Sequence, residues 1–161
     1  MQKKIKVINN SAVKEAIRRA KISSKDSYLY DAFLICTVRE ADKKDKEFIN
    51  NYLKKMRSKG LKMYYPAEDT NQVDPLGGYT ICSDNCKAIK DSKEVHVYWT
   101  DKSQGTKFDL GIAFYEHKAQ GKRIKLANKS QVEKMIEEQK NKGIKKSFEM
   151  VLLKLDNLAK E

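Results

Sequence analysis

The sequence contains no apolar run long enough to cross a membrane. Its longest runs, such as residues 32–36, are far shorter than the roughly 20 apolar residues that a membrane-spanning helix needs. No apolar segment follows the basic residues 1–6, so we expect no signal peptide. We therefore expect the chain to make no contact with a membrane.

Cysteine and histidine are scarce. The three cysteines, Cys36, Cys82 and Cys86, are odd in number and lack the spacing of a disulfide scaffold, which favours a reduced, cytoplasmic protein. His96 and His117 are the only histidines, and the sequence has neither a Cys-x-x-Cys nor a His-x-x-x-His pair. We therefore predict buried structural thiols rather than a metal site.

Internal repeats and low-complexity linkers are also absent, and a length of 161 residues predicts one domain. We divide it into a basic N-terminal extension (1–27), a core (28–128) and a C-terminal helical segment (129–161).

Basic residues are in excess, with 34 Lys and Arg against 22 Asp and Glu and a net charge of +12. The lysines are spread along the whole chain, whereas a nucleic-acid-binding surface usually concentrates its charge on one element. The pattern therefore favours solvated helix faces, and nucleic acid is not an expected partner. A positive field does raise the association rate of anionic nucleotides.

Strand and helix patterns alternate along the chain. Residues 30–38 form a near-continuous apolar run, which is typical of a central parallel strand. We predict further strands at 61–65, 95–99 and 123–127 and a short strand at 5–8. Helices are predicted at 43–58 and 80–91, after Ser103 up to Gln120, and, as a basic helix, at 12–20. A final apolar helix at 148–158 is expected to pack on the core or on another subunit. Residues 67–79 are a predicted loop, where α/β proteins place binding residues.

This alternation predicts the fold class. We expect an α/β protein with a flavodoxin-like or Rossmann-like three-layer sandwich, in which a parallel sheet of four to five strands carries helices on both faces.

The most informative segment is 103–114, which follows a predicted buried strand and opens a predicted helix. Ser103, Gly105 and Thr106 stand just before this helix, where free N–H groups and the positive end of the helix dipole favour a phosphate or a sugar. Asp109 is expected in the first turn, facing the same pocket. An anion site beside a carboxylate indicates chemistry on the sugar of a nucleotide.

Three segments together resemble the nucleoside 2-deoxyribosyltransferase superfamily, which includes the 2′-deoxynucleoside 5′-monophosphate N-glycosidases. Residues 36–39 read Cys-Thr-Val-Arg, similar to Gly-Ser-Ile-Arg at the end of the first strand in the nucleotide glycosidases. Residues 85–92 read Asn-Cys-Lys-Ala-Ile-Lys-Asp-Ser, similar to the family's Asp-x-x-Ala-Ile-x-x-Ser/Ala. Residues 105–113, with Gly-Lys at 121–122, are similar to Gly-Thr-x-x-Glu-Leu-Gly-x-Ala and its later Gly-Lys.

The resemblance implies an enzyme that cleaves an N-glycosidic bond through a carboxylate at C1′ of a nucleoside or nucleotide, by transfer or hydrolysis. Asp109 matches the nucleophile, and Thr37, Arg39 and Ser103 match positions that hold the 5′-phosphate, a role that suits the planar fork of an arginine. Asn85 matches an aspartate that lies near the sugar and base, and Asp84, one residue earlier, could take that place only through a local shift in the helix. The resemblance further implies a homodimer or higher homo-oligomer and no metal or organic cofactor.

Three positions depart from the family pattern. Asp109 replaces a glutamate, which withdraws the carboxylate by about one C–C bond, roughly 1.5 Å. Asn85 replaces an aspartate, and Glu40 stands where a glycine is expected. These departures keep a second interpretation open, a nucleotide-binding or sensor protein with weak catalysis. Residues 30–35 also resemble the opening strand of Toll/interleukin-receptor-like NAD-processing domains, which is a third interpretation.

The candidate residues also have purely structural interpretations. A carboxylate such as Asp109 is favoured near a helix N-terminus by the dipole, and the small residues at 103–106 are common in turns and caps. The remaining alternatives are an ion pair of Arg39 with Glu40 or Asp42, an N-cap role for Asp84, and core packing rather than base stacking for Tyr98 and Trp99.

Overall fold

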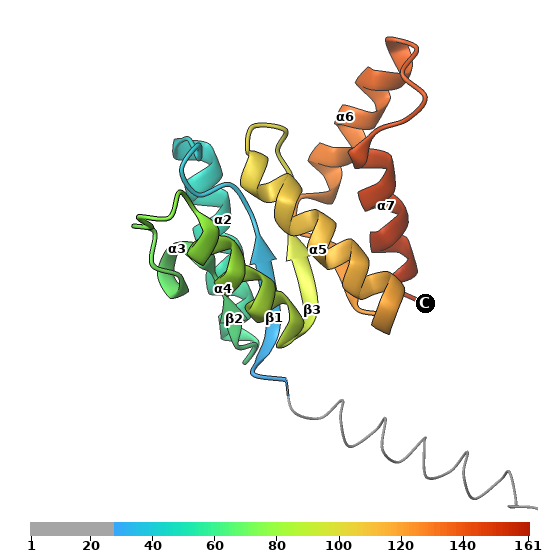
Figure 1. Ribbon diagram of the computed structural model, residues 1–161. Helices are drawn as coiled ribbons and strands as arrows, with labels where there is room; N and C mark the ends of the chain where they lie inside the picture. Colours follow the sequence, from blue (N-terminus) through green and yellow to red (C-terminus); the bar gives the residue numbers. More distant parts are fainter. Residues whose placement is uncertain (1–27) are drawn as a thin grey trace, which may run out of the picture.

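The computed structural model describes residues 28–161, so the strand and basic helix predicted at 5–8 and 12–20 lie outside the described residues. Its centre is a four-stranded, fully parallel sheet with the strand order β2-β1-β3-β4 (Figure 1). The strands are β1 (Tyr30–Ile35), β2 (Met63–Tyr64), β3 (Ser92–Val97) and β4 (Arg123–Leu126). The predicted α/β class and three-layer architecture are confirmed.

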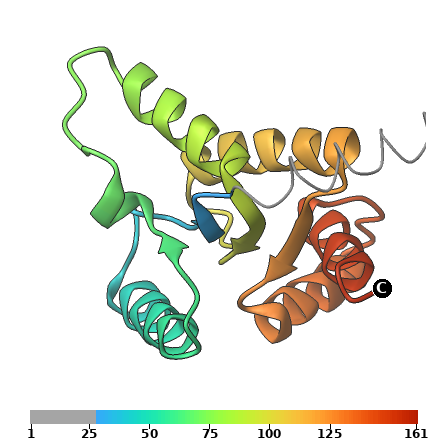
Figure 2. The same cartoon turned by 90° about the horizontal axis from the view of Figure 1, so that it is seen from below.

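Six helices flank the sheet within the described residues: α2 (Lys43–Ser58), α3 (Pro66–Asp69), α4 (Tyr79–Lys90), α5 (Gln104–Gln120), α6 (Lys129–Asn141) and α7 (Phe148–Leu158). Figure 2 shows α4 and α5 on one face of the sheet and α2 on the other. Ile49 and Leu53 of α2 pack with Ala32 and Leu34 of β1. On the opposite face a larger core joins β1, β3 and β4 to α4 and α5, and it continues into α6 and α7 beside β4. Among residues 28–161, no helix is both long enough and apolar enough to cross a membrane.

Three of the four strands are shorter than the sequence predicts, whereas β3 is shifted toward the N-terminus, and hydrogen bonding explains where β3 ends. β3 begins at Ser92 and stops at Val97, whereas a strand was predicted at 95–99. The Asn128 side chain accepts a hydrogen bond from Trp99 N (2.9 Å) and donates one to Trp99 O (2.8 Å), so Trp99 is bonded to this amide rather than to a neighbouring strand. β1 likewise ends at Ile35, before the predicted Val38.

The predicted loop at 67–79 begins with a short helix. Pro66 starts α3, as expected for a residue whose fixed φ suits the first helical turn. The rest of the segment, up to Gly78, is loop or turn and leads into α4. The sequence missed α3 because a single turn leaves too short a pattern to detect.

The strand order places a crevice beside β1. The chain moves from β1 outward to β2 and then returns to β3 on the other side of β1. The segments that follow β1 and β3 therefore leave the sheet in opposite directions, and such a topological switch point is where open α/β sheets bind ligands.

Candidate functional site

A cavity of about 520 Å³ lies at the carboxyl ends of β1 and β3, and its lining includes most of the site residues that the sequence predicts. The loop after β1, the loop between α3 and α4, the first turns of α4 and the N-terminal half of α5 all contribute to it. Its lining residues are Cys36, Val38, Arg39, Glu40, Pro66, Gln72, Gly77, Gly78, Ile81, Cys82, Asn85, Ser103, Gln104, Gly105, Thr106, Phe108 and Asp109.

The N-terminus of α5 forms one wall of the cavity. Ser103 is the N-cap, and its hydroxyl accepts a hydrogen bond from the backbone N–H of Thr106 (3.4 Å). The Thr106 side chain is only 1% exposed, and its hydroxyl oxygen has no hydrogen-bond partner within residues 28–161. A buried polar group without a partner is destabilising, so this hydroxyl beside a helix N-terminus fits an incoming polar ligand. Gly105 also lines the cavity, although an added Cβ would make only an ordinary 3.7 Å contact there.

Asp109 lies in the same helix but in its second turn. α5 begins at Gln104, so the expected first-turn position is wrong by about one turn. The Asp109 side chain lines the cavity and is 8% exposed. Burial raises its pKa from 3.8 to about 6, and a hydrogen bond from Asn85 offsets part of this rise. A carboxylate that titrates near neutral pH in a cavity is a candidate for catalysis.

Asn85 of α4 is hydrogen-bonded to the Asp109 carboxylate. Its amide nitrogen donates to Asp109 Oδ2 at 3.0 Å, and its amide oxygen accepts from the Thr70 hydroxyl at 3.1 Å. Because that bond uses the only hydroxyl proton of Thr70, Tyr64 must donate in the 2.7 Å contact between the two hydroxyls. The sequence identified Asn85 through the resemblance but gave no signal for Tyr64 or Thr70.

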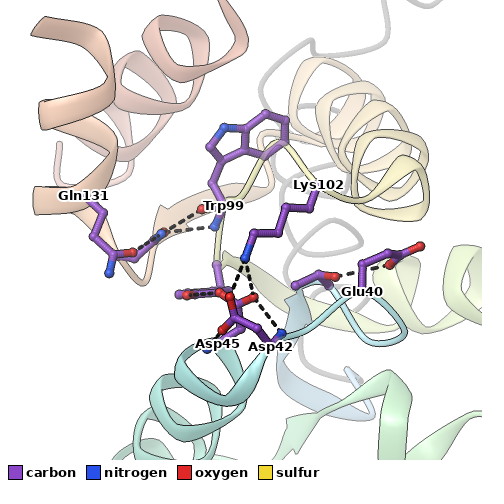
Figure 3. Close-up of polar contacts among 9 residues, drawn as sticks. Glu40, Asp42, Asp45, Trp99, Lys102 and Gln131 are labelled. Atoms are coloured by element: carbon purple, nitrogen blue, oxygen red, sulfur yellow. Dashed lines mark hydrogen bonds and ion pairs between the residues drawn. The ribbon is translucent and has the colours of Figure 1, made fainter. Parts of the chain in front are cut away.

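Thr37 and Arg39 differ in their relation to the cavity. Thr37 is fully buried and does not line the cavity, and its hydroxyl donates to Glu40 Oε2 at 3.2 Å. Figure 3 shows Glu40 in this contact. Arg39 lines the cavity, and its Nη2 donates to the backbone oxygen of Gln72 at 3.0 Å. The alternative in which Arg39 pairs with Glu40 or Asp42 has no such contact in the structure.

Asp84 is an exposed residue in the middle of α4 and does not line the cavity. The interpretation of Asp84 as an N-cap is wrong, because α4 starts at Tyr79 after a left-handed Gly78. Asp74 of the preceding loop takes that role instead, since its carboxylate accepts hydrogen bonds from the backbone N–H groups of Thr80 (2.7 Å) and Ile81 (3.1 Å).

Tyr98 and Trp99 are buried outside the cavity, as the core-packing interpretation expects. The Trp99 indole donates to Glu149 Oε1 (2.7 Å), and the Tyr98 hydroxyl donates to Asp45 Oδ1 (2.8 Å).

Lys102 fixes the loop that carries the α5 cap. Its ammonium group contacts Asp42 Oδ2 at 2.7 Å and Asp45 Oδ2 at 3.0 Å, both at the N-terminus of α2 (Figure 3). Asp42 and Asp45 also form the capping box of that helix. The loop before Ser103 is therefore joined by these ion pairs to the N-terminus of α2.

The cysteines only partly fit the predicted buried thiols. Cys36 is buried in the cavity wall, and burial together with the nearby Asp109 charge raises its pKa to about 12. Cys82 is half-buried and also lines the cavity, whereas Cys86 is exposed, which contradicts the prediction. Within residues 28–161, no three His, Cys, Asp or Glu side chains converge as a metal site requires.

Comparison of the chain with models of protein families, with curated proteins and with solved structures gives no match.

Proposed function

We propose that the protein is a nucleoside or nucleotide N-glycosidase or 2-deoxyribosyltransferase that uses Asp109 at C1′ of the sugar. The observation that carries the proposal is a buried carboxylate, with a pKa raised to about 6, in a cavity at the switch point of a parallel sheet. The three segments that resemble the deoxyribosyltransferase superfamily support the same chemistry.

In the proposed reaction, an ionised Asp109 oxygen attacks C1′ and the C1′–N bond breaks. The bonding electron pair leaves with the base, which takes a proton from solvent, and the transition state has oxocarbenium character. Water or a second base then displaces the Asp109 ester and restores the carboxylate. Asn85 is a positioning residue in this scheme, because its amide holds one Asp109 oxygen at 3.0 Å.

The cavity has a suitable size for such a substrate, since ligand pockets commonly measure about 300–1,000 Å³ and this one measures about 520 Å³. Ser103, Gly105 and Thr106 support a phosphate or a sugar hydroxyl at the N-terminus of α5. Glu40 brings a second carboxylate to the cavity edge, and its charge opposes a phosphate placed beside Thr37. The proposal therefore covers both nucleosides and 5′-monophosphates.

A homodimer is the proposed assembly. Four apolar side chains near the cavity mouth are more than half exposed: Val73, Leu76, Tyr79 and Phe108. Apolar groups gathered on one surface are typical of protein interfaces. Sedimentation of the full chain, with a Leu76→Ser/Tyr79→Ser variant, tests this assembly. A monomer at all concentrations, or an unchanged oligomer in the variant, contradicts it.

The catalytic test follows free base by chromatography during incubation with deoxynucleosides, their 5′-monophosphates and NAD. Asp109→Asn removes the nucleophile with little change of shape, and Asp101→Asn is the matched control, because Asp101 is exposed and does not line the cavity. We expect base release in the wild type and in the control, increasing as the pH rises through about 6, and none in Asp109→Asn. Base release only from NAD would favour the NAD-processing interpretation.

A nucleotide-binding or sensor protein is the second candidate, and the short Asp109 side chain favours it, because reach on the scale of an ångström strongly affects rates. Asp109→Glu separates the two candidates. A weak enzyme gains base release when the carboxylate reaches about 1.5 Å further, whereas a binding protein stays inactive and shows only a ligand-dependent rise in melting temperature.

A further inference from the structure

A second hollow, away from the candidate site, lies between α5 and α7. It has a volume of about 390 Å³, and its apolar floor consists of Phe114, Met150, Val151, Leu155 and Leu158. Phe114 and Val151 are 41% and 40% exposed, so apolar surface stays in contact with water there. Figure 1 shows α5 and α7 side by side, and we call the hollow between them the α5–α7 groove.

The edges of this groove carry one sign of charge. Lys118 comes from α5, Lys154 comes from α7, and Lys145 and Lys146 come from the segment before α7. No Asp or Glu lines the groove. Among the described residues, none of these four ammonium groups forms an ion pair or a hydrogen bond. The groove therefore presents an apolar floor between unneutralised positive edges.

Charge argues against an occupant from this protein itself. In a twofold dimer the same surface meets itself, so a second copy would bring the four lysines against four more. Residues 1–27 contain eight Lys and Arg against two Asp and Glu, so their net charge has the same sign as that of the groove.

Shape and polarity argue against two other anionic partners. A bilayer is flat on the scale of this groove, and its headgroups would not reach the concave apolar floor. A nucleic acid offers phosphates to the lysines but has no apolar side chains for Phe114 and Val151. A helix with one apolar face and one acidic face matches both features, because helical peptides place anchors at i, i+3 or i+4 and i+7 into apolar grooves.

We propose that the α5–α7 groove binds an acidic amphipathic α-helix of another protein. The apolar face of that helix lies on Phe114 and Val151, and its flanking carboxylates pair with Lys118 and Lys154 across the groove. This role is independent of the chemistry proposed for Asp109.

The test measures binding of labelled peptides to the full chain by fluorescence anisotropy. Each peptide has about 16 residues, which is long enough for an apolar stripe over four helical turns. The panel contains acidic peptides with leucines in a helical stripe at different registers, the same compositions with the leucines scrambled, and a lysine counterpart. The groove variant is Lys118→Glu/Lys154→Glu. The matched control is Lys44→Glu/Lys54→Glu, which changes the net charge equally at two exposed positions of α2. Anionic vesicles and duplex DNA serve as unlabelled competitors.

We expect a striped acidic peptide to bind, with at least about tenfold loss of affinity, or about 1.4 kcal/mol, in the groove variant and less than about twofold loss in the control. Val151→Asp should also weaken binding. Absence of binding across the panel, equal affinity of scrambled peptides, or equal losses in the two double variants would overturn the proposal. Stronger binding of vesicles or DNA that depends on Lys118 and Lys154 would overturn it in favour of that partner.

Discussion

Replacing the buried acid at the candidate site should make the protein more stable. Asp109→Asn keeps the shape of the side chain, and an amide oxygen at this position still accepts the hydrogen bond from Asn85. What disappears is the unfavourable transfer of a negative charge out of water. We therefore expect Asp109→Asn to unfold at a higher temperature and urea concentration than the wild type at pH 7.5.

The magnitude follows from the pKa. Burial raises the pKa of Asp109 from 3.8 to about 6, and one pKa unit corresponds to about 1.4 kcal/mol. A carboxyl group with a raised pKa in the folded protein contributes stability that is complete below its unfolded pKa and is lost as the pH rises through the folded value. The wild type should therefore lose about 3 kcal/mol between pH 3 and pH 7.5 through this group, and the variant should not.

Urea denaturation of both proteins at pH 4.5 and pH 7.5 provides the assay. Asp109→Asn should be more stable by about 3 kcal/mol at pH 7.5 and by only about 1 kcal/mol at pH 4.5, where Asp109 is protonated in the folded state. At this chain length about 3 kcal/mol corresponds to roughly 6–12 °C in Tm. Asp101→Asn controls for the lost surface charge. A gain that is absent, or that does not change with pH, would refute the argument that Asp109 is buried and desolvated.

Three further changes test other contacts. The buried ammonium group of Lys122 donates hydrogen bonds to the backbone oxygens of Ile89 (2.6 Å), Lys90 (2.8 Å) and Ser92 (2.6 Å). Lys122→Met removes all three and should lower the free energy of unfolding by about 3–5 kcal/mol. A loss below about 1 kcal/mol in urea denaturation would contradict this prediction. Asp74→Ala releases two N–H groups of α4 and should speed proteolysis within 70–78, whereas cleavage at the wild-type rate would show that this cap does not hold the loop. Asn85→Asp places a second carboxylate beside Asp109 and should raise the pKa of Asp109 further, which NMR titration checks; an unchanged or lower value would contradict the contact.

The fold was predictable because its strongest signals are local. The apolar run that contains β1, the amphipathic pattern of α2 and the glycine after α5 each specify one element, and the alternation of elements specifies a parallel sheet. The same local reasoning found Ser103, Thr106 and Asp109, which lie within two turns of one helix. Strand ends were less accurate, because a distant side chain, Asn128, is hydrogen-bonded to the backbone of Trp99 just beyond β3.

Contacts between distant residues were not predictable from these patterns. Tyr64, Thr70 and Asn85 come from three different segments, and nothing in their local sequence indicates that they form one hydrogen-bonded chain behind Asp109. β3 gives a second example of contacts that the local sequence does not indicate, on the face of the sheet that packs against α2. Glu94 and His96 are buried there with a hydrogen bond between Glu94 Oε1 and His96 Nε2 at 2.7 Å, although they alternate with apolar residues as solvent-facing positions usually do.

The instability of ionised Asp109 and the proposed chemistry have one physical origin. In the free protein the charge lies in a poorly solvated cavity wall with one amide donor, which makes its ionisation unfavourable by about 3 kcal/mol relative to water. A positive charge that develops at C1′ would stand next to this carboxylate and relieve that penalty, while a neutral ground-state sugar would not. An interaction that strengthens only as the bond to the base breaks lowers the barrier rather than tightening substrate binding. Burial of Asp109 therefore favours catalysis at C1′ over simple nucleotide binding, for which a desolvated carboxylate offers no gain.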